Sequence, residues 1–219
     1  MNDGLKRIPG QRQYRIADAP LAPASPKPDT FDMPKPLTQI AHELLSPVIQ
    51  AGDFAVDATV GNGHDTRFLA EQVGDEGKVL GLDVQESAIL VTAARLGEAG
   101  LKHRVDLVQK GHEQLDKLLP EGMRAKLKVV MFNLGYLPGG DHGLITRADT
   151  TLKALDAALG QLRPDGLISL MVYRGHPGGN EEYRAITDWL EQASCRAEYP
   201  DTGERPDAAP VLMHIHPDR

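Results

Sequence analysis

An acidic residue ends the apolar segment 54–57, and a glycine-rich loop follows it with a spacing that is typical of a cofactor site. The segment FAVD is followed by ATVGNGHDT, so Asp57 lies four residues before Gly61. A glycine loop at such a junction could bind a dinucleotide pyrophosphate or the methionine part of S-adenosylmethionine. A dinucleotide fingerprint requires a third glycine where this chain has Thr66. We therefore favour S-adenosylmethionine, with Asp57 fixing its amino group, directly or through water, while Gly61 and Gly63 allow close backbone approach.

The loop departs from the common methyltransferase form D/E-x-G-x-G-x-G at one position. Thr59 stands where that form has its first glycine, and we keep Thr59 among the expected cofactor-binding residues. The alternative interpretation is a tight turn between a strand and a helix that binds no ligand.

A second acid follows the next apolar segment and supports an adenosine cofactor. GLD ends at Asp83, 22 residues after Gly61, where one carboxylate can accept both ribose hydroxyls. NAD would use the same acid, so Asp83 does not choose between the two cofactors. Gln85 is expected along the adenine or at the start of a helix. Gly111 and His112, after a third strand, are expected near the adenine edge, although His112 could simply begin a helix.

The stretch NLGYLPGGDH, which follows the apolar run LKVVMF, has the composition of an active-site loop. Amine-directed methyltransferases place (N/D)-P-P-(Y/F) at this point, and Asn133 and Tyr136 keep both ends of that pattern. The Asn133 oxygen would accept a hydrogen bond from the acceptor NH₂ and aim its lone pair at the methyl group, while Tyr136 would stack on a base. The alternative is an elaborate turn around a core tyrosine.

An alkylamine must lose a proton before it can attack a methyl group. Asp141 and His142, at the end of the same loop, are the nearest candidates to accept it, although Asp141 could equally brace the glycine turn. A second glycine-rich loop, VYRGHPGGNEE, follows the fifth strand and places Tyr173 and His176 beside the same cleft. A lone histidine there is more often structural than catalytic.

The pattern of apolar segments must position these residues, and it predicts a doubly wound α/β fold. Apolar runs alternate with amphipathic segments, which favours a mostly parallel seven-stranded sheet with helices on both faces. The last two strands have only a turn-rich segment between them and should form an antiparallel hairpin. The expected strands are 54–57, 78–83, 104–109, 127–133, 167–173, 195–199 and 210–216. The expected helices are 37–50 with a break near Pro47, 66–73, 86–100, 112–119, 150–162 and 181–193.

Composition limits the domain organisation and the compartment. Residues 1–36 hold seven of the 16 prolines and are expected to be an extended or disordered arm, while 37–219 form one domain. The chain lacks the ~18–20 consecutive apolar residues of a membrane span. Its N-terminus also lacks the apolar segment of a signal peptide. The single cysteine, Cys195, excludes an internal disulfide and a Cys-based zinc site and fits a cytoplasmic protein. We expect no metal.

The long motifs VDATVGNGHDTRFLA, NLGYLPGGDH and VYRGHPGGNEE resemble the bacterial family labelled rRNA methylases. Its characterised members are tRNA 5-(aminomethyl)-2-thiouridine methyltransferases, and the resemblance covers about residues 37–216. It implies a class I fold, S-adenosylmethionine as methyl donor, the wobble position of the tRNA anticodon arm as substrate, and a homodimer. Asn62, Asp65 and Asn133 then join the cofactor-binding residues, and Asn133, Tyr136 and Asp141 are the catalytic residues that it implies.

RNA binding has to be reconciled with a net charge of −7. It would require basic residues gathered near the cleft, and Arg147 and Arg174 each lie near the carboxyl end of a strand. The expected substrate-binding residues are Tyr136, His142, Tyr173, His176, Arg147 and Arg174. Alternatives are an rRNA methyltransferase, an N-methyltransferase of a small-molecule or protein amine, and a non-catalytic binding protein. An NAD-type oxidoreductase is disfavoured by Thr66.

Overall fold

The computed structural model describes residues 35–135, 137, 139 and 145–218. The predicted arm 1–36 lies almost wholly outside this range, so the predicted domain boundary stays a prediction. The helices are α1 (Leu37–Leu45), α2 (His64–Val73), α3 (Glu86–Glu98), α4 (Leu115–Leu118), α5 (Ala148–Gln161) and α6 (Gly179–Leu190). The strands are β1 (Phe54–Asp57), β2 (Lys78–Asp83), β3 (Val105–Gln109), β4 (Leu127–Leu134), β5 (Leu162–Val172), β6 (Cys195–Glu198) and β7 (Val211–Pro217).

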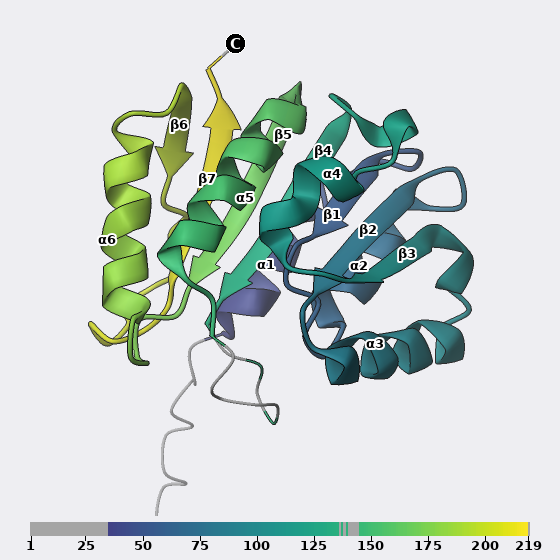
Figure 1. The fold of residues 1–219 in the computed structure, drawn as a ribbon, viewed down its shortest axis with the longest axis horizontal. Helices are drawn as coiled ribbons and strands as arrows, with labels where there is room; N and C mark the ends of the chain where they lie inside the picture. Colours follow the sequence, from purple (N-terminus) through teal and green to yellow (C-terminus); the bar gives the residue numbers. More distant parts are fainter. Residues whose placement is uncertain (1–34, 136, 138, 140–144, 219) are drawn as a thin grey trace, which may run out of the picture. The chain divides into compact units, whose positions relative to one another are not determined.

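These strands form one seven-stranded sheet in the order β3-β2-β1-β4-β5-β7-β6. All pairs from β3 to β5 are parallel, whereas β7 pairs antiparallel with both β5 and β6. In Figure 1 the arrow of β7 accordingly points opposite to that of β5. The predicted fold class, including the antiparallel hairpin of the last two strands, is confirmed.

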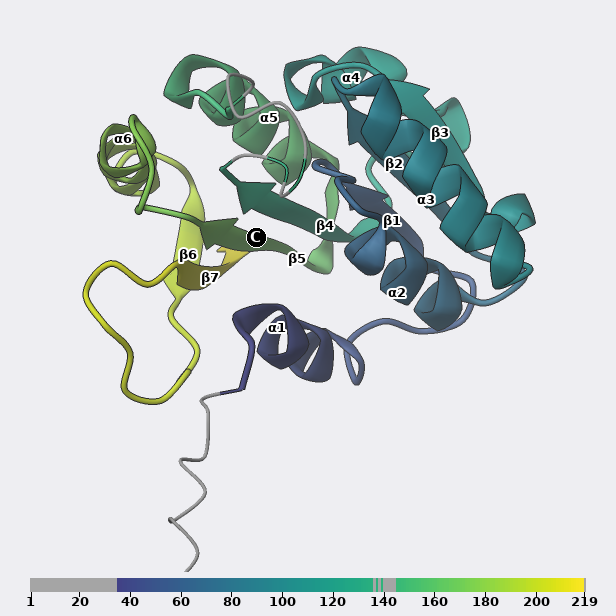
Figure 2. The same ribbon diagram turned by 90° about the horizontal axis from the view of Figure 1, so that it is seen from below.

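Alternating side chains of the central strands pack against helices on both faces of the sheet. On β4, Val130 and Phe132 face the cluster that includes α4, α5 and α6, while Val129 and Met131 face the cluster of α2 and α3. This alternation is the period-two pattern of a strand buried on both sides. Figure 2 shows α1 and α2 on one side of the sheet and α5 on the other.

Helix α1 covers the part of the sheet that the other helices of its face leave open. Leu37 and Ala41 pack against Met171 of β5 and Leu212 of β7 in a small separate cluster. The helix ends at Leu45 and does not continue to residue 50, because Ser46 to Val48 form a turn. Its position places the residues of one helical face beside the carboxyl ends of the central strands.

The predicted break near Pro47 is thus confirmed, while most other predicted boundaries differ by one to three residues and two predicted elements differ more. Strand β5 begins at Leu162, five residues before the predicted start, and an irregularity shifts its register between Leu127 and Val129 of β4. A side chain at Gly166 would lie 2.6 Å from the Leu127 carbonyl oxygen, so glycine permits this close pairing. The predicted helix 112–119 is a 3₁₀ turn, His112–Gln114, followed by the single turn of α4.

Candidate active site

A cavity of about 540 Å³ lies beyond the carboxyl ends of β1, β2, β4 and β5. This is the edge at which doubly wound sheets bind ligands. Of the predicted site residues, the cavity is lined by Thr59, Gly61, Asn62, Asp65, Asp83, Gln85, Gly111, His112, Asn133, Arg147 and Tyr173. Predicted residues from segments far apart in the chain therefore line one continuous cavity.

The glycine loop is held in place by Asp83 of the neighbouring strand. The backbone N–H of Gly61 donates to Oδ2 of Asp83 (2.9 Å), and that of Gln85 donates to Oδ1 (2.9 Å). Gly61 and Gly63 have φ angles of 52° and 75°, in the left-handed region that favours glycine. Gly63 precedes α2 and does not line the cavity. The Asp83 carboxylate thus joins the loops after β1 and β2 where both loops line the cavity.

Asp57 lies beneath the glycine loop and outside the cavity lining. Its side chain is fully buried, and it accepts hydrogen bonds from the Thr66 hydroxyl (2.5 Å) and the Thr59 N–H (3.2 Å). Burial, followed by the charge of nearby Asp65, raises the pKa of Asp57 to about 7. Asp57 therefore shapes the loop from below, and any influence on a ligand passes through that loop.

Asn133, near the end of β4, connects the glycine loop to the other end of the cavity. Its backbone N–H donates to the Thr59 hydroxyl (2.7 Å), and its side-chain Nδ2 donates to Oδ2 of Asp65 (2.5 Å). The hydroxyl of Thr59 thus gives a reason for the threonine at the first glycine position of the loop. The second oxygen of Asp65 lies 2.5 Å from Nε2 of His42, on α1.

The opposite end of the cavity holds a buried histidine. The His112 ring packs edge-on against Phe132, with 5.9 Å between ring centroids. Burial lowers the pKa of His112, so the ring is neutral near pH 7. Its Nε2 is buried and has no hydrogen-bond partner among the described residues. The His112 residue lines the cavity, while its Nε2 is shielded from solvent.

The end of the cavity near Asn133 combines an aromatic ring with less polar walls. Tyr173 lines the cavity, and burial, followed by the charge of Asp65, raises the pKa of its hydroxyl, which keeps it protonated. Leu137 and Ile145, on either side of the loop after β4, add apolar surface. The backbone N–H of Thr146 donates to the Gly135 carbonyl (2.9 Å) and closes the base of that loop. Tyr136, Asp141 and His142 lie outside the described residues, so their predicted roles stay predictions.

Two predicted substrate residues do not line this cavity. The Arg174 guanidinium donates to the carbonyl oxygens of Asp207 and Ala209 and lies 5.3 Å from the ring centroid of Tyr183. It borders a second cavity of about 280 Å³, beside the segment between β6 and β7. His176 interacts with the Pro177 carbonyl (3.0 Å) and is also absent from the lining.

The sequence interpretation missed the contribution of α1. Thr38 lines the cavity, and His42 binds Asp65 while its ring stacks on Phe68, with centroids 4.1 Å apart and planes 4° apart. The segment LTQIAHELL reads only as an amphipathic helix, and no motif marks its histidine. Buried Glu182 was missed as well; it accepts hydrogen bonds from Thr146 and Thr151 and anchors the loop base to α6.

The sheet order, the reversed β7 and the glycine loop beside Asp83 define a class I methyltransferase fold. A family model described as "Putative rRNA methylase" matches residues 79–215, and the chain belongs to that family. Among the described residues, every helix is too short or too polar to cross a bilayer.

Solved structures with this fold include close relatives. A crystal structure described as a "putative rRNA-methylase" from Clostridium thermocellum has 37% sequence identity and a TM-score of 0.76, covering 82% of this chain and 96% of that one. A "putative methyltransferase" from Streptococcus mutans, solved in complex with SAH, has 31% identity and a TM-score of 0.72, covering 84% and 99%.

A relative of named activity is the chloroplastic tRNA (mnm(5)s(2)U34)-methyltransferase of Arabidopsis thaliana. It is 45% identical over 173 residues, which cover 71% of this chain. The match covers 62% of the plant protein, so this chain spans about three fifths of that relative's length.

Proposed function

We propose that this chain is an S-adenosylmethionine-dependent methyltransferase that acts on an exocyclic amine of RNA. The best candidate is the aminomethyl nitrogen of 5-aminomethyl-2-thiouridine at the tRNA wobble position. One observation carries the proposal: Asn133 lies in the cavity and donates its backbone N–H to Thr59 of the glycine loop. The residue that would hold the acceptor is thereby fixed to the loop that would hold the donor.

The residues of the cavity fit S-adenosylmethionine. A volume of about 540 Å³ is within the usual range for a cofactor site. The carboxylate of Asp83 lies beside a loop with two glycines of positive φ, and His112, neutral near pH 7, lines the other end of the cavity. When bound, S-adenosylmethionine supplies a methyl group on a positively charged sulfur. Asp83 would bind its ribose, and Gln85, Gly111 and His112 would border its adenine.

The acceptor amine would be positioned by Asn133. The side-chain oxygen of Asn133 can accept an N–H and so align the nitrogen lone pair, which makes the chemistry chiefly one of positioning. Tyr173 would contact the base or the sugar, because its ring lines the same end of the cavity. Tyr136 as the stacking ring, and Asp141 or His142 as proton acceptor, belong to the same proposal.

The acceptor class rests on the relatives and on the cavity rim. The plant relative is named for a tRNA wobble activity, which supports tRNA over rRNA. Arg147 and Lys110 line the cavity and supply cations that could contact RNA phosphates. We further propose a cytoplasmic homodimer, since a second copy would extend the surface available to an anticodon arm. Residues 1–36 would form an arm on the domain 37–219.

A small-molecule or protein amine is the second candidate acceptor. The net charge of −7 favours it, as do the acids Asp65, Asp83 and Glu113 in the cavity wall, which would attract a free ammonium compound. This candidate uses the same cofactor residues and differs only in what binds beyond Asn133.

Transfer of labelled methyl from S-adenosylmethionine separates the two candidates. Bulk tRNA lacking the methyl group, rRNA and a pool of small amines would be offered in parallel. The proposal predicts label in tRNA. Label confined to the small amines would retain the donor site and the role of Asn133 but would reject RNA as the acceptor.

A further inference from the structure

We propose that Asp65 and His42 form a positioning pair that sets the orientation of the Asn133 side chain. The pair thereby restricts the acceptor to a group that donates a hydrogen bond. This inference rests on the proposed function, since it describes how the acceptor end of the same cavity is organised. It assigns a functional role to helix α1, which carries none of the motif residues.

The orientation of an asparagine amide follows from what its partner can do. Asp65, as a carboxylate, only accepts hydrogen bonds, so the Asn133 atom 2.5 Å from its Oδ2 must be the nitrogen. The oxygen of Asn133 is then directed away from Asp65. Because Asn133 lines the cavity, that oxygen is the atom available to an acceptor group there.

His42 fixes the other side of the Asp65 carboxylate. Its Nε2 lies 2.5 Å from Oδ1 of Asp65, and its ring stacks nearly parallel on Phe68 of α2. Asp65 is 6% exposed, so it has little access to water as a competing partner. With both oxygens engaged and the histidine ring clamped, the carboxylate has little freedom to rotate away from Asn133.

The charge of this pair also matches an amine acceptor. Burial, followed by the charge of Asp65, raises the pKa of Asp57 beneath the glycine loop and of Tyr173 in the cavity wall, so the negative charge of Asp65 acts both at the cavity wall and beneath the loop. An alkylamine is mostly protonated near neutral pH, so the carboxylate attracts it before it loses its proton, whereas a hydroxyl group carries no net charge. The acceptor oxygen of Asn133, backed by a carboxylate, therefore selects an N–H donor over a carbon or tertiary amine nucleophile.

Exchanging the side chains of Asp65 and Asn133 tests the proposed orientation of the Asn133 amide. In Asn133→Asp the new carboxylate faces Asp65, and turnover should fall by about 100-fold or more because the two charges repel each other. In Asp65→Asn the pair of amides can adopt two orientations, and turnover should fall about 10-fold. The double variant Asp65→Asn, Asn133→Asp restores a donor facing an acceptor, and it should be at least about 10-fold more active than Asn133→Asp alone.

Matched variants control for a merely structural effect. His42→Phe keeps the stacking on Phe68 but removes the bond to Asp65, and it should lower kcat about 10-fold with little change in KM for S-adenosylmethionine. The exposed pair His103 and Asp75 (3.1 Å) is the control, and His103→Phe should leave kcat within about two-fold. A double variant no more active than Asn133→Asp, with both proteins folded, would overturn the proposal.

A measurement on the cofactor-free protein makes the test independent of the proposed reaction. In nitrogen-15 NMR spectra, the side-chain NH₂ of Asn133 should exchange slowly with water, and His42→Phe should accelerate that exchange. Exchange in the wild type as fast as that of exposed Asn180 would overturn the positioning role. Failure of the wild type to methylate tRNA, rRNA or any amine would instead reject the proposed function, and the amide exchange would still decide the orientation.

Discussion

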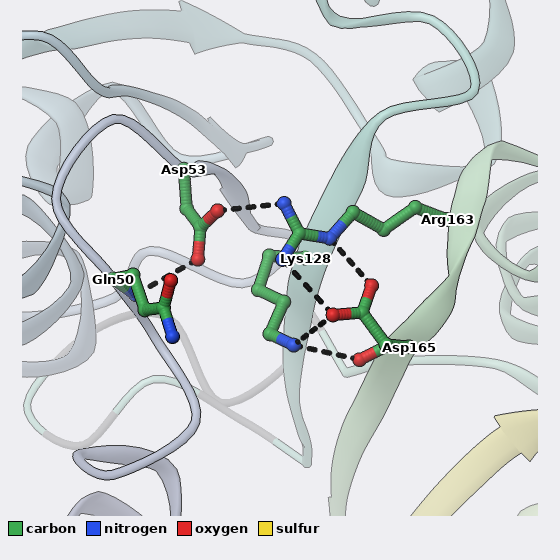
Figure 3. Close-up of polar contacts among 5 residues, drawn as sticks. All are labelled: Gln50, Asp53, Lys128, Arg163 and Asp165. Atoms are coloured by element: carbon green, nitrogen blue, oxygen red, sulfur yellow. Dashed lines mark hydrogen bonds and ion pairs between the residues drawn. The ribbon is translucent and has the colours of Figure 1, made fainter.

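Charged residues lie beside both ends of the central parallel strands, but their charges are balanced differently at the two ends. At the amino end, Arg163 binds Asp53 (2.8 Å) and Asp165 (2.6 Å), and Lys128 binds Asp165 (2.9 Å). Figure 3 shows these two cations and two acids as one chain of contacts, with Gln50 on the far side of Asp53. The charges at this end are balanced within the protein itself.

At the carboxyl end the acids outnumber their cationic partners. Among the described residues, Asp57 and Asp83 form no ion pair, and the side chain of Asp65 contacts His42 and Asn133. The pKa values differ accordingly: Arg163 lowers the pKa of Asp165, whereas burial raises that of Asp57. The comparison indicates that the amino end stabilises the fold, while the carboxyl end is left with negative charge suited to a cationic ligand.

Asn133→Ala should give the largest effect, and at the carboxyl end only. We expect turnover to fall about 100- to 1,000-fold, because the acceptor loses its positioning group, while cofactor affinity changes less than about three-fold. Steady-state kinetics and calorimetric titration with S-adenosylhomocysteine measure the two quantities. Asn180→Ala, on exposed α6 surface, is the control, and normal turnover in Asn133→Ala would show that the account of this loop is wrong.

Arg163→Met should lower the stability of the protein and leave its turnover nearly unchanged. It leaves the buried carboxylate of Asp53 without its cation, so the free energy of unfolding should fall by about 2–3 kcal/mol. Turnover below the melting range should stay within about two-fold, since Arg163 is remote from the cavity lining. Urea denaturation measures the first quantity. A loss of turnover without a loss of stability would contradict the division between the two ends.

Asp83→Ala should weaken cofactor binding about 10-fold, because the side chain holds the Gly61 N–H and would also bind the ribose. Isothermal titration gives the affinity. Asp106→Ala, on neighbouring β3, is the matched control. Unchanged affinity in Asp83→Ala would place the ribose elsewhere.

Asp57→Asn should change the pH dependence of stability. Because the folded-state pKa of Asp57 is raised to about 7, its contribution to stability is present below about pH 4 and is lost as the pH rises through 7. The variant should therefore be more stable than the wild type at pH 8, by up to about 4 kcal/mol for a pKa raised from 3.8 to about 7, and this difference should vanish near pH 4. Melting curves from pH 4 to 8 measure it, and a constant difference would exclude Asp57 as its source.

The sequence predicted those parts of the site that follow the ends of apolar strands. Asp83 and Asn133 could be placed because each closes a strand, and parallel strands bring their carboxyl ends to one edge. His42 could not, because its contact with Asp65 joins two helices packed side by side, and a helical histidine has no periodic signal of its own. Arg174 also follows a strand, yet its guanidinium turns to carbonyl oxygens more than 30 residues away. Strand ends are predictable, whereas the direction of a long side chain depends on tertiary packing.

The most direct test of the account is the chemical position of the transferred methyl group. tRNA treated with the enzyme and labelled S-adenosylmethionine would be digested to nucleosides and examined by mass spectrometry. The account predicts the label on the aminomethyl nitrogen of the wobble 2-thiouridine, and its loss in Asn133→Ala. Label on a ring carbon or on a ribose oxygen would contradict it, because a ring carbon offers no hydrogen-bond donor to the oxygen of Asn133 and a ribose hydroxyl is not the cationic amine that Asp65 would attract.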